Sequence, residues 1–255
     1  MRGLLATLRN AVAEARANPA AMVSQLAIMV ANDVVWVIFW VLFFRRVGTV
    51  RGWDGDRILL LLAVLTSAGG IALGVLANAR RIGNLAVDGE LDGVLALPVP
   101  PLPHLLLRRL EAINVGDLVF GLMLFAFTGS HTVARTAVFA GAVIAVAILV
   151  TGFLVLTGSL AFFIGRNEGG ELGFHAIVLL GAYPVDVFAG AVKVVLYTVV
   201  PAAFVSSVPA RLIEDFSVTR ALLLAGVAAT FALAGWAAFT LGLRRYASGS
   251  VWTRP

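Results

Sequence analysis

Cysteine is absent from this 255-residue sequence, and only 13% of its residues are charged. The absence of cysteine excludes disulfide bonds, thiolate metal sites and cysteine nucleophiles. The small charged fraction excludes an ordinary soluble domain, in which about 25% of residues carry a charge. A nucleic-acid-binding protein would need the net charge of +5 to be gathered in one soluble patch, and the basic residues are scattered instead. We therefore predict no nucleic-acid partner.

Motifs for catalysis, nucleotide hydrolysis and metal binding are also missing. There is no G-x-x-x-x-G-K-[ST] phosphate loop and no G-x-S-x-G element. The three histidines, His104, His131 and His175, lack the spacing of a metal site. We predict no catalytic residue, no metal site and no cofactor bound by this chain.

Hydrophobic residues make up 60% of the chain, and the mean hydropathy is +0.98. A membrane-spanning helix needs roughly 20 mainly apolar residues. The sequence therefore predicts an all-α polytopic membrane protein, with residues 19–255 forming one transmembrane domain. Six spans are predicted, at about residues 22–44, 58–79, 110–129, 137–164, 172–190 and 220–243.

Residues 1–18 form an amphipathic segment, with Arg2, Arg9 and Arg16 on one helical face and leucines on the other. This pattern predicts a helix that lies in the membrane interface, with its cations near anionic headgroups. A signal peptide is disfavoured because the apolar run that follows is too long for one. Asn18 and Pro19 predict the cap and first turn of a new helix.

A polar and aromatic stripe runs along the first predicted span. It contains Gln25, Asn32, Trp36 and Trp40, with Asp33 beside it. A carboxylate at the bilayer centre costs about 2.5–3.5 kcal/mol on insertion scales, so the stripe should face protein or water. Two interpretations remain open: the stripe lines a translocation pathway, or Asn32 and Asp33 bond a neighbouring helix at a subunit interface.

The second and third spans carry further signals. Gly70 and Gly74 form a G-x-x-x-G motif, which is typical of close helix packing. Asp117 lies inside the third span, where we expect a polar contact with another helix, with a proton relay as the alternative. Glu111 is expected at the interface near Arg108.

Residues 80–108, between the second and third spans, predict a short cytoplasmic helix that is stopped by prolines. Such a helix would be a rigid knob able to pass motion to a docked partner; the alternative is an ordinary interfacial loop. Farther along, the apolar stretch 174–209 is too long for one crossing and too short for two crossings plus a turn. We expect one span there, followed by short re-entrant or external helices over 186–209.

The order of these elements, together with four motifs, resembles the permease of a bacterial type-2 ATP-binding cassette (ABC) exporter, within a six-span subfamily. The motifs are GELDGVLALPVPPLP at 89–103, YPVDVF at 183–188, VVPAAFVSSVPA at 199–210 and GLRRYASGS at 242–250. The resemblance implies that residues 1–18 are the interface helix and that residues around 88–97 are the coupling helix. It also implies that residues 186–209 cap the outer side of the route.

The resemblance further implies the partners and the site residues. Two cytoplasmic ABC ATPase subunits would bind ATP and Mg²⁺. A second permease, a paralogue of this chain, would complete the assembly. Membrane lipid would be a further partner. The residues expected to dock the ATPase are Asp88, Glu90, Leu91, Asp92, Val94, Leu95, Leu97 and Pro98. The residues expected in the pathway or the permease interface are Gln25, Asn32, Asp33, Trp36, Asp117, Tyr183 and Asp186. Exported substrates in such a family are drugs, lipids or glycan carriers, and the shortage of tyrosine disfavours glycans.

Basic residues predict the orientation, because Lys and Arg accumulate in cytoplasmic loops. If both termini are cytoplasmic, more basic residues lie in the cytoplasmic segments than in the outer ones. Arg166 and Arg254 are among the cytoplasmic ones, whereas Arg45 and Arg46 would lie outside and disfavour this orientation. We therefore expect a multi-pass protein of the bacterial plasma membrane. Two other functions stay open: an ion-gradient-driven transporter or channel that uses Asp33, Asp117 and Asp186, and a non-transporting membrane anchor.

Overall fold

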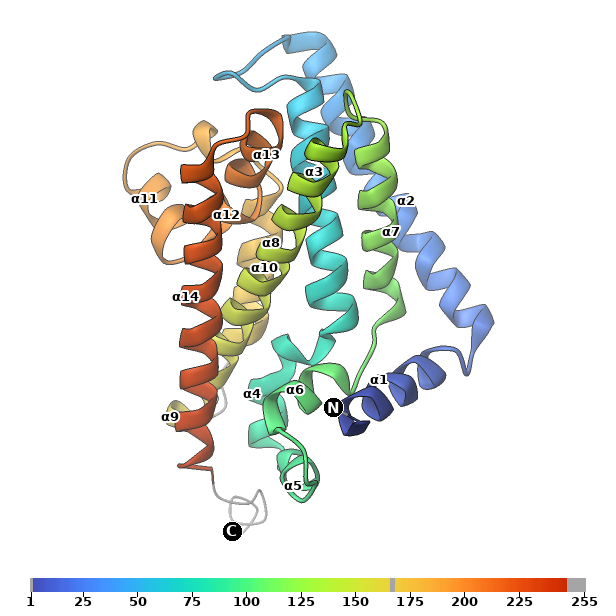
Figure 1. The fold of residues 1–255 in the computed structure, drawn as a ribbon, viewed down its shortest axis with the longest axis vertical. Helices are drawn as coiled ribbons and strands as arrows, with labels where there is room; N and C mark the ends of the chain where they lie inside the picture. Colours follow the sequence, from blue (N-terminus) through green and yellow to red (C-terminus); the bar gives the residue numbers. More distant parts are fainter. Residues whose placement is uncertain (1, 166–167, 247–255) are drawn as a thin grey trace.

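The computed structural model describes residues 2–165 and 168–246, and these residues fold almost entirely into helices (Figure 1). Arg166, Arg254 and residues 247–250 of the terminal motif, all used in the sequence predictions, lie outside the described residues. Within the described ranges, four helices are long and apolar enough to cross a membrane. They are α2 (Pro19–Val47), α3 (Gly55–Gly69) continued by the π-helix η1 (Gly70–Val75), α8 (Val133–Ser159) continued by α9 (Ala161–Ile164), and α14 (Val218–Leu243).

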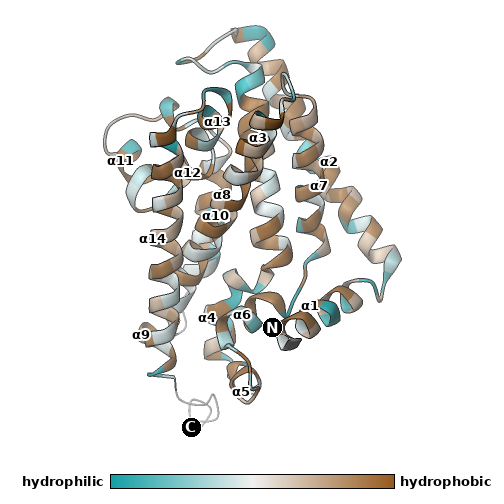
Figure 2. Cartoon of the chain, in the orientation of Figure 1, coloured by the Kyte–Doolittle hydropathy of each residue, from teal (hydrophilic) through white to brown (hydrophobic). Residues whose placement is uncertain are grey.

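Two shorter apolar helices, α7 (Ala112–Ala126) and α10 (Gly169–Gly181), run among the long ones. Brown, hydrophobic residues follow all of these helices, whereas teal residues gather on α1 and near the ends of the molecule (Figure 2). The chain is a polytopic helical membrane protein, as its composition predicts.

The N-terminal helix α1 (Arg2–Ala15) lies across the end of α2 rather than continuing it (Figure 1). The side chain of Asn18 accepts a hydrogen bond of 3.1 Å from the backbone N–H of Ala21, and Pro19 occupies the first turn of α2. The predicted cap at Asn18 and Pro19 is therefore confirmed, and it is the local reason for the change of direction.

Helix boundaries differ from the predicted spans where glycine or proline intervenes. α10 ends at Gly181, well before the predicted end at 190, because Pro184 cannot continue a helix. The second span becomes a π-helix at Gly70 and gives way after Val75 to the 3₁₀-helix η2 (Ala77–Arg81), rather than staying regular to 79.

Glycine lets η1 and α7 approach closely. A Cβ built on Gly70 would lie 2.7 Å from the Cα of Leu118, and one on Gly74 would lie 2.7 Å from the backbone nitrogen of Val115. No side chain fits in either place, so the G-x-x-x-G pair is a packing seam, as its spacing predicts.

A second glycine seam joins α8 to α14. A Cβ on Gly152 would lie 2.6 Å from the backbone nitrogen of Ala232, and one on Gly235 would lie 2.5 Å from the carbonyl oxygen of Gly152. Beside it, the rings of Phe153 and Phe231 meet edge to face with centroids 5.8 Å apart. These two seams hold the long helices in one bundle.

Between η1 and α7 the chain makes short helices at one end of the molecule, the end where α1 also lies (Figure 1). After η2 come α4 (Ile82–Val87), α5 (Leu91–Leu95) and α6 (Pro101–Leu107). The helical part of the predicted 88–97 helix is thus limited to α5. Gly89 adopts a φ of +79°, a conformation that favours glycine, and this turn separates α4 from α5.

The opposite end of the molecule carries the stretch between α10 and α14 (Figure 1). It forms the 3₁₀-turn η3 (Val185–Val187) and the helices α11 (Gly190–Thr198), α12 (Ala202–Val205) and α13 (Ser207–Glu214). The chain bends by 62° between α11 and the pair that follows it. Pro201 stands at this bend, since it cannot donate the backbone hydrogen bond that a continuing helix needs.

Candidate functional site

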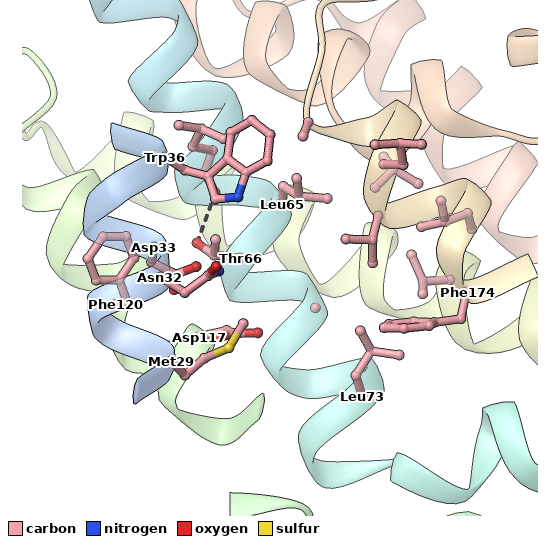
Figure 3. A pocket seen from close by; sticks show the side chains of 18 of the residues that line it. Met29, Asn32, Asp33, Trp36, Leu65, Thr66, Leu73, Asp117, Phe120 and Phe174 are labelled. Carbon is pink, nitrogen blue, oxygen red and sulfur yellow. Dashed lines mark hydrogen bonds between the residues drawn. The ribbon is translucent and has the colours of Figure 1, made fainter. Parts of the chain in front are cut away.

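A pocket of about 360 Å³ opens between α2, α3, α7, α8 and α10 (Figure 3). Its wall is mostly apolar, with Leu65, Leu73 and Val178 among the aliphatic side chains. Aromatic rings are added by Trp36, Phe120 and Phe174. A space of this kind suits a ligand with a large apolar surface.

Two carboxylates interrupt this apolar wall. Asp33 of α2 and Asp117 of α7 both line the pocket, and each side chain is buried with 6% of its surface exposed. Oδ2 of Asp33 and Oδ1 of Asp117 are buried and have no hydrogen-bond partner. The sequence predicted each acid separately, and the packing of α2 on α7 brings them to one side of one pocket (Figure 3).

The remaining residues of the predicted stripe divide into two groups. Asn32 and Trp36 line the pocket, whereas Gln25 is exposed and does not. Tyr183 packs edge to face on Trp36 and Trp40, with ring centroids 6.3 and 5.6 Å apart. This aromatic cluster ties the segment after α10 to the middle of α2.

Phe174 and His175 of α10 also line the pocket, together with Thr66 of α3, and the sequence did not single out any of them for this place. For His175 the sequence predicts only that it does not belong to a metal site. A lone polar residue on a short apolar helix was the available signal, but the sequence does not tell which wall that helix forms.

Asp186 does not line the pocket. It lies near the end of the molecule that carries α11 to α13. Its carboxylate accepts hydrogen bonds from Trp53 Nε1 at 3.0 Å and from Lys193 Nζ at 3.1 Å, and it also pairs with Arg211. Its backbone carbonyl accepts a bond of 2.7 Å from Arg51. Asp186 thus joins the α2–α3 loop to η3, α11 and α13.

The ionisation of Asp186 follows from these contacts. Partial burial opposes the charged form, but hydrogen bonds from Trp53 and Lys193 and the positive charges of Arg211 and Lys193 outweigh it. The pKa of Asp186 therefore lies below its ordinary value. Nearby, Arg57 donates a hydrogen bond of 2.8 Å to the carboxylate of Glu214.

At the opposite end, the residues expected to dock a partner point in different directions. Leu91 and Val94 are buried against the chain itself, with 1% of each side chain exposed. Leu95 and Leu97 are 41% and 46% exposed. The sequence could not separate the two pairs, because it does not show which face of α5 packs on the bundle.

The polar members of this segment lie on its surface. Asp88, Glu90 and Pro98 are exposed. Asp92 is exposed too, and it accepts a hydrogen bond of 2.9 Å from the hydroxyl of Tyr246.

Hydrogen bonds and two ion pairs connect η1, η2, α6 and the start of α7. Asn78 donates to the carbonyl of Leu105 at 2.8 Å, and the backbone N–H of Glu111 donates to the carbonyl of Gly74 at 2.9 Å. Glu111 pairs with Arg80 at 3.0 Å, and at 3.5 Å with Arg109 rather than with the expected Arg108. These contacts connect α6 to η2, and connect η1 and η2 to the start of α7.

The helix α1 is joined to the same segment. Thr7 Oγ1 and His104 Nδ1 are hydrogen-bonded at 2.8 Å. Burial and the neighbouring charge of Arg108 lower the pKa of His104, which favours its neutral form. A groove beside this bond is lined by Glu90, Gly93, Leu97, His104 and Arg108.

Comparison with known proteins identifies a family for the chain. A model of a family described as ABC-2 family transporter protein matches residues 30–250, which is most of the chain. No curated protein and no solved structure matches the chain. The matched range includes the pocket, the α4–α6 segment and the Asp186 cluster.

Proposed function

The chain belongs to the ABC-2 transporter family, as a membrane permease component, and from that premise we propose that it exports an amphipathic or apolar substrate across the bacterial plasma membrane. Energy comes from a separate cytoplasmic ATPase, because the sequence has no phosphate loop of its own. Two ATPase subunits and a second permease, a paralogue, complete the assembly, and ATP and Mg²⁺ bind on the ATPase.

We propose six crossings, made by α2, α3 with η1, α7, α8, α10 and α14, with both termini in the cytoplasm. The path of the ribbon supports this, since α1 and the end of α14 lie at the same end of the molecule as α4–α6 (Figure 1). α7 and α10 have only 15 and 13 residues, which at about 1.5 Å per residue is short for a 30 Å core. After α10, the residues Ala182, Pro184 and Val185, which lie outside the α-helices, are buried by other parts of the protein, which a membrane tolerates. The loop after α7 is largely exposed, with Phe127 82% exposed, and we place it at the membrane surface.

The observation that carries the coupling proposal is the α5 surface. Leu95 at the end of α5 and Leu97 just after it are exposed apolar side chains. The next helix, α6, is hydrogen-bonded to η2, and η2 is ion-paired to the start of α7. Exposed leucines at the cytoplasmic end offer a docking contact, and this connection passes the partner's movement to the wall of the pocket. Glu90 and Asp92 would add contacts with basic ATPase residues.

The exposed face of α2 supports the proposed permease pairing. Val35, Ile38 and Leu42 leave more than half of each side chain uncovered by the chain itself. In a membrane this face contacts lipid or the second permease, and the pocket behind it would then lie beside the joint between the two permeases.

Leu95→Asp tests the coupling proposal in cells that also express the ATPase. The new charge should abolish co-purification of the ATPase or its substrate-stimulated ATP turnover, because a charge in an apolar contact is costly. Phe216→Asp is the control: Phe216 is 59% exposed and lies between α13 and α14, at the other end of the molecule. Normal assembly and turnover in Leu95→Asp would refute the coupling role of α5.

An ion-gradient-driven transporter is the second candidate, favoured by one observation: Asp33 and Asp117 share a pocket. The third acid of that hypothesis, Asp186, does not line this pocket and has Lys193 and Arg211 as partners. Flux in proteoliposomes that needs an ion gradient and no ATPase would favour this candidate. The third hypothesis is a non-transporting membrane anchor. It would be favoured if a strain that lacks this protein showed unstable partner proteins but unchanged flux.

A further inference from the structure

The pocket between α2, α3, α7, α8 and α10 contains two buried acids for which the described lining residues supply no lysine or arginine partner. Asp33 and Asp117 are each more than nine-tenths buried, and each has a carboxylate oxygen without a hydrogen-bond partner. Among the described residues that line the pocket, none is lysine or arginine, and His175 is the one side chain that can become a cation. The ionised form of a buried acid in an apolar wall is costly unless a positive group joins it.

The other lining residues indicate the shape and chemistry of that positive group. Trp36 and Phe120 lie beside the two acids, and Phe174 lies on the opposite wall (Figure 3). Aromatic faces attract cations that are poorly hydrated, such as quaternary ammonium groups. A small inorganic cation would find two carboxylates but a wall too apolar to complete a shell of oxygen ligands.

We propose that this pocket binds a lipophilic organic cation, with its positive charge at Asp33 and Asp117 and its apolar body against the aromatic wall. This inference rests on the proposed transport function and names its substrate class. The cation replaces the missing counter-charge, and the apolar walls favour a bulky hydrophobic body over a hydrated ion.

The test uses two probes of similar size and opposite charge, tetraphenylphosphonium and tetraphenylborate. The permease assembly, with its ATPase, is placed in lipid nanodiscs, and binding is measured by equilibrium dialysis against protein-free nanodiscs. We expect tetraphenylphosphonium to bind more tightly than tetraphenylborate. Equal affinity for the two probes, or preference for the borate, would overturn the proposal.

Variants then locate the charge. Asp33→Asn and Asp117→Asn should each weaken tetraphenylphosphonium binding roughly 10- to 100-fold, because each removes one partner of a buried charge pair. Asp33→Glu keeps the charge and should keep the preference for the phosphonium. Asp215→Asn is the control, since that carboxylate is 81% exposed and pairs with Arg220 outside the pocket. Unchanged affinity in both asparagine variants would refute the site.

Failure of this inference differs from failure of the transport proposal. Selective binding that depends on Asp33, found in an assembly that shows no substrate-stimulated ATP turnover, would support the site and contradict ATP-driven export. Normal ATP turnover that depends on Leu95, found together with binding that does not depend on the charge of the probe, would support ATP-driven export and contradict the cation site. Size-exclusion elution of each variant assembly shows whether it has folded, and the Asp117→Asn variant provides an independent measurement if Asp33→Asn does not assemble.

Discussion

At the scale of single residues, the three acids predicted for the pathway or the permease interface divide by whether the chain supplies their counter-charge. Asp186 has Lys193 and Arg211 as ionic partners. Asp33 and Asp117 have no such partner among the described residues, and each leaves an oxygen unbonded. The sequence could predict that each acid would be buried or paired, from the cost of a charge in the membrane. It could not predict which acids would be paired, because the partners of Asp186 come from three separate segments.

Asp186→Asn should lower the stability of the protein by roughly 2 kcal/mol at pH 7, because hydrogen bonds to charged groups are among the stronger ones. The pKa of Asp186 is lower in the folded protein than its ordinary value of 3.8. Its contribution is therefore complete above that value and is lost as the pH falls below it. Thermal unfolding in detergent of wild type and variant should differ at pH 7 and converge below about pH 4.

The matched control for this prediction is Asp215→Asn. Asp215 also pairs with an arginine, but its side chain is 81% exposed, so the change should stay within about 0.5 kcal/mol. An Asp186→Asn variant as stable as this control at pH 7 would contradict the assigned role of Asp186 in joining the α2–α3 loop to α11 and α13.

At the scale of elements, glycines decide how closely the helices approach. The spacing of Gly70 and Gly74 predicted a close contact, and the partner helix proves to be α7. Gly152 and Gly235 make an equally close contact between α8 and α14. They lie far apart in the sequence and form no spaced motif together, so only the packed bundle reveals them.

Gly70→Ala and Gly69→Ala form a matched pair. A Cβ on Gly70 would collide with Leu118, whereas one on Gly69 meets nothing within 4 Å. Gly70→Ala should destabilise the protein by about 1–3 kcal/mol through overpacking. Gly69→Ala should be neutral or stabilising by up to about 1 kcal/mol, because alanine is the better helix former. Thermal unfolding measures both, and equal stability of the two variants would contradict the seam between η1 and α7.

Short helices were the least predictable elements. The sequence predicts a helix over 88–97 that is ended by prolines, and the structure limits its helical part to α5 because Gly89 turns the chain just before it. A glycine has too many allowed conformations for its turn to be read from sequence. The early end of α10 follows from Pro184, a signal that the sequence does contain.

At the scale of the whole molecule, the bundle separates the proposed docking surface, the pocket and the Asp186 cluster. The end with α1 and α4–α6 presents exposed leucines, the centre holds the pocket, and the opposite end holds the Asp186 cluster (Figure 1). Composition and apolar runs predicted the membrane fold and the order of its parts. The pocket could not be predicted, because it exists only where α2, α7 and α10 converge from distant parts of the chain.

The central claim is that an ATPase docks on α5, and the lack of cysteine makes a direct measurement available. Leu95→Cys gives the chain a single thiol, which can carry a photoactivatable benzophenone in membranes that contain the ATPase. We predict cross-linking of the ATPase from position 95 and none from the control Phe216→Cys. Cross-linking from position 216, or none from position 95 while the ATPase still co-purifies, would contradict the account.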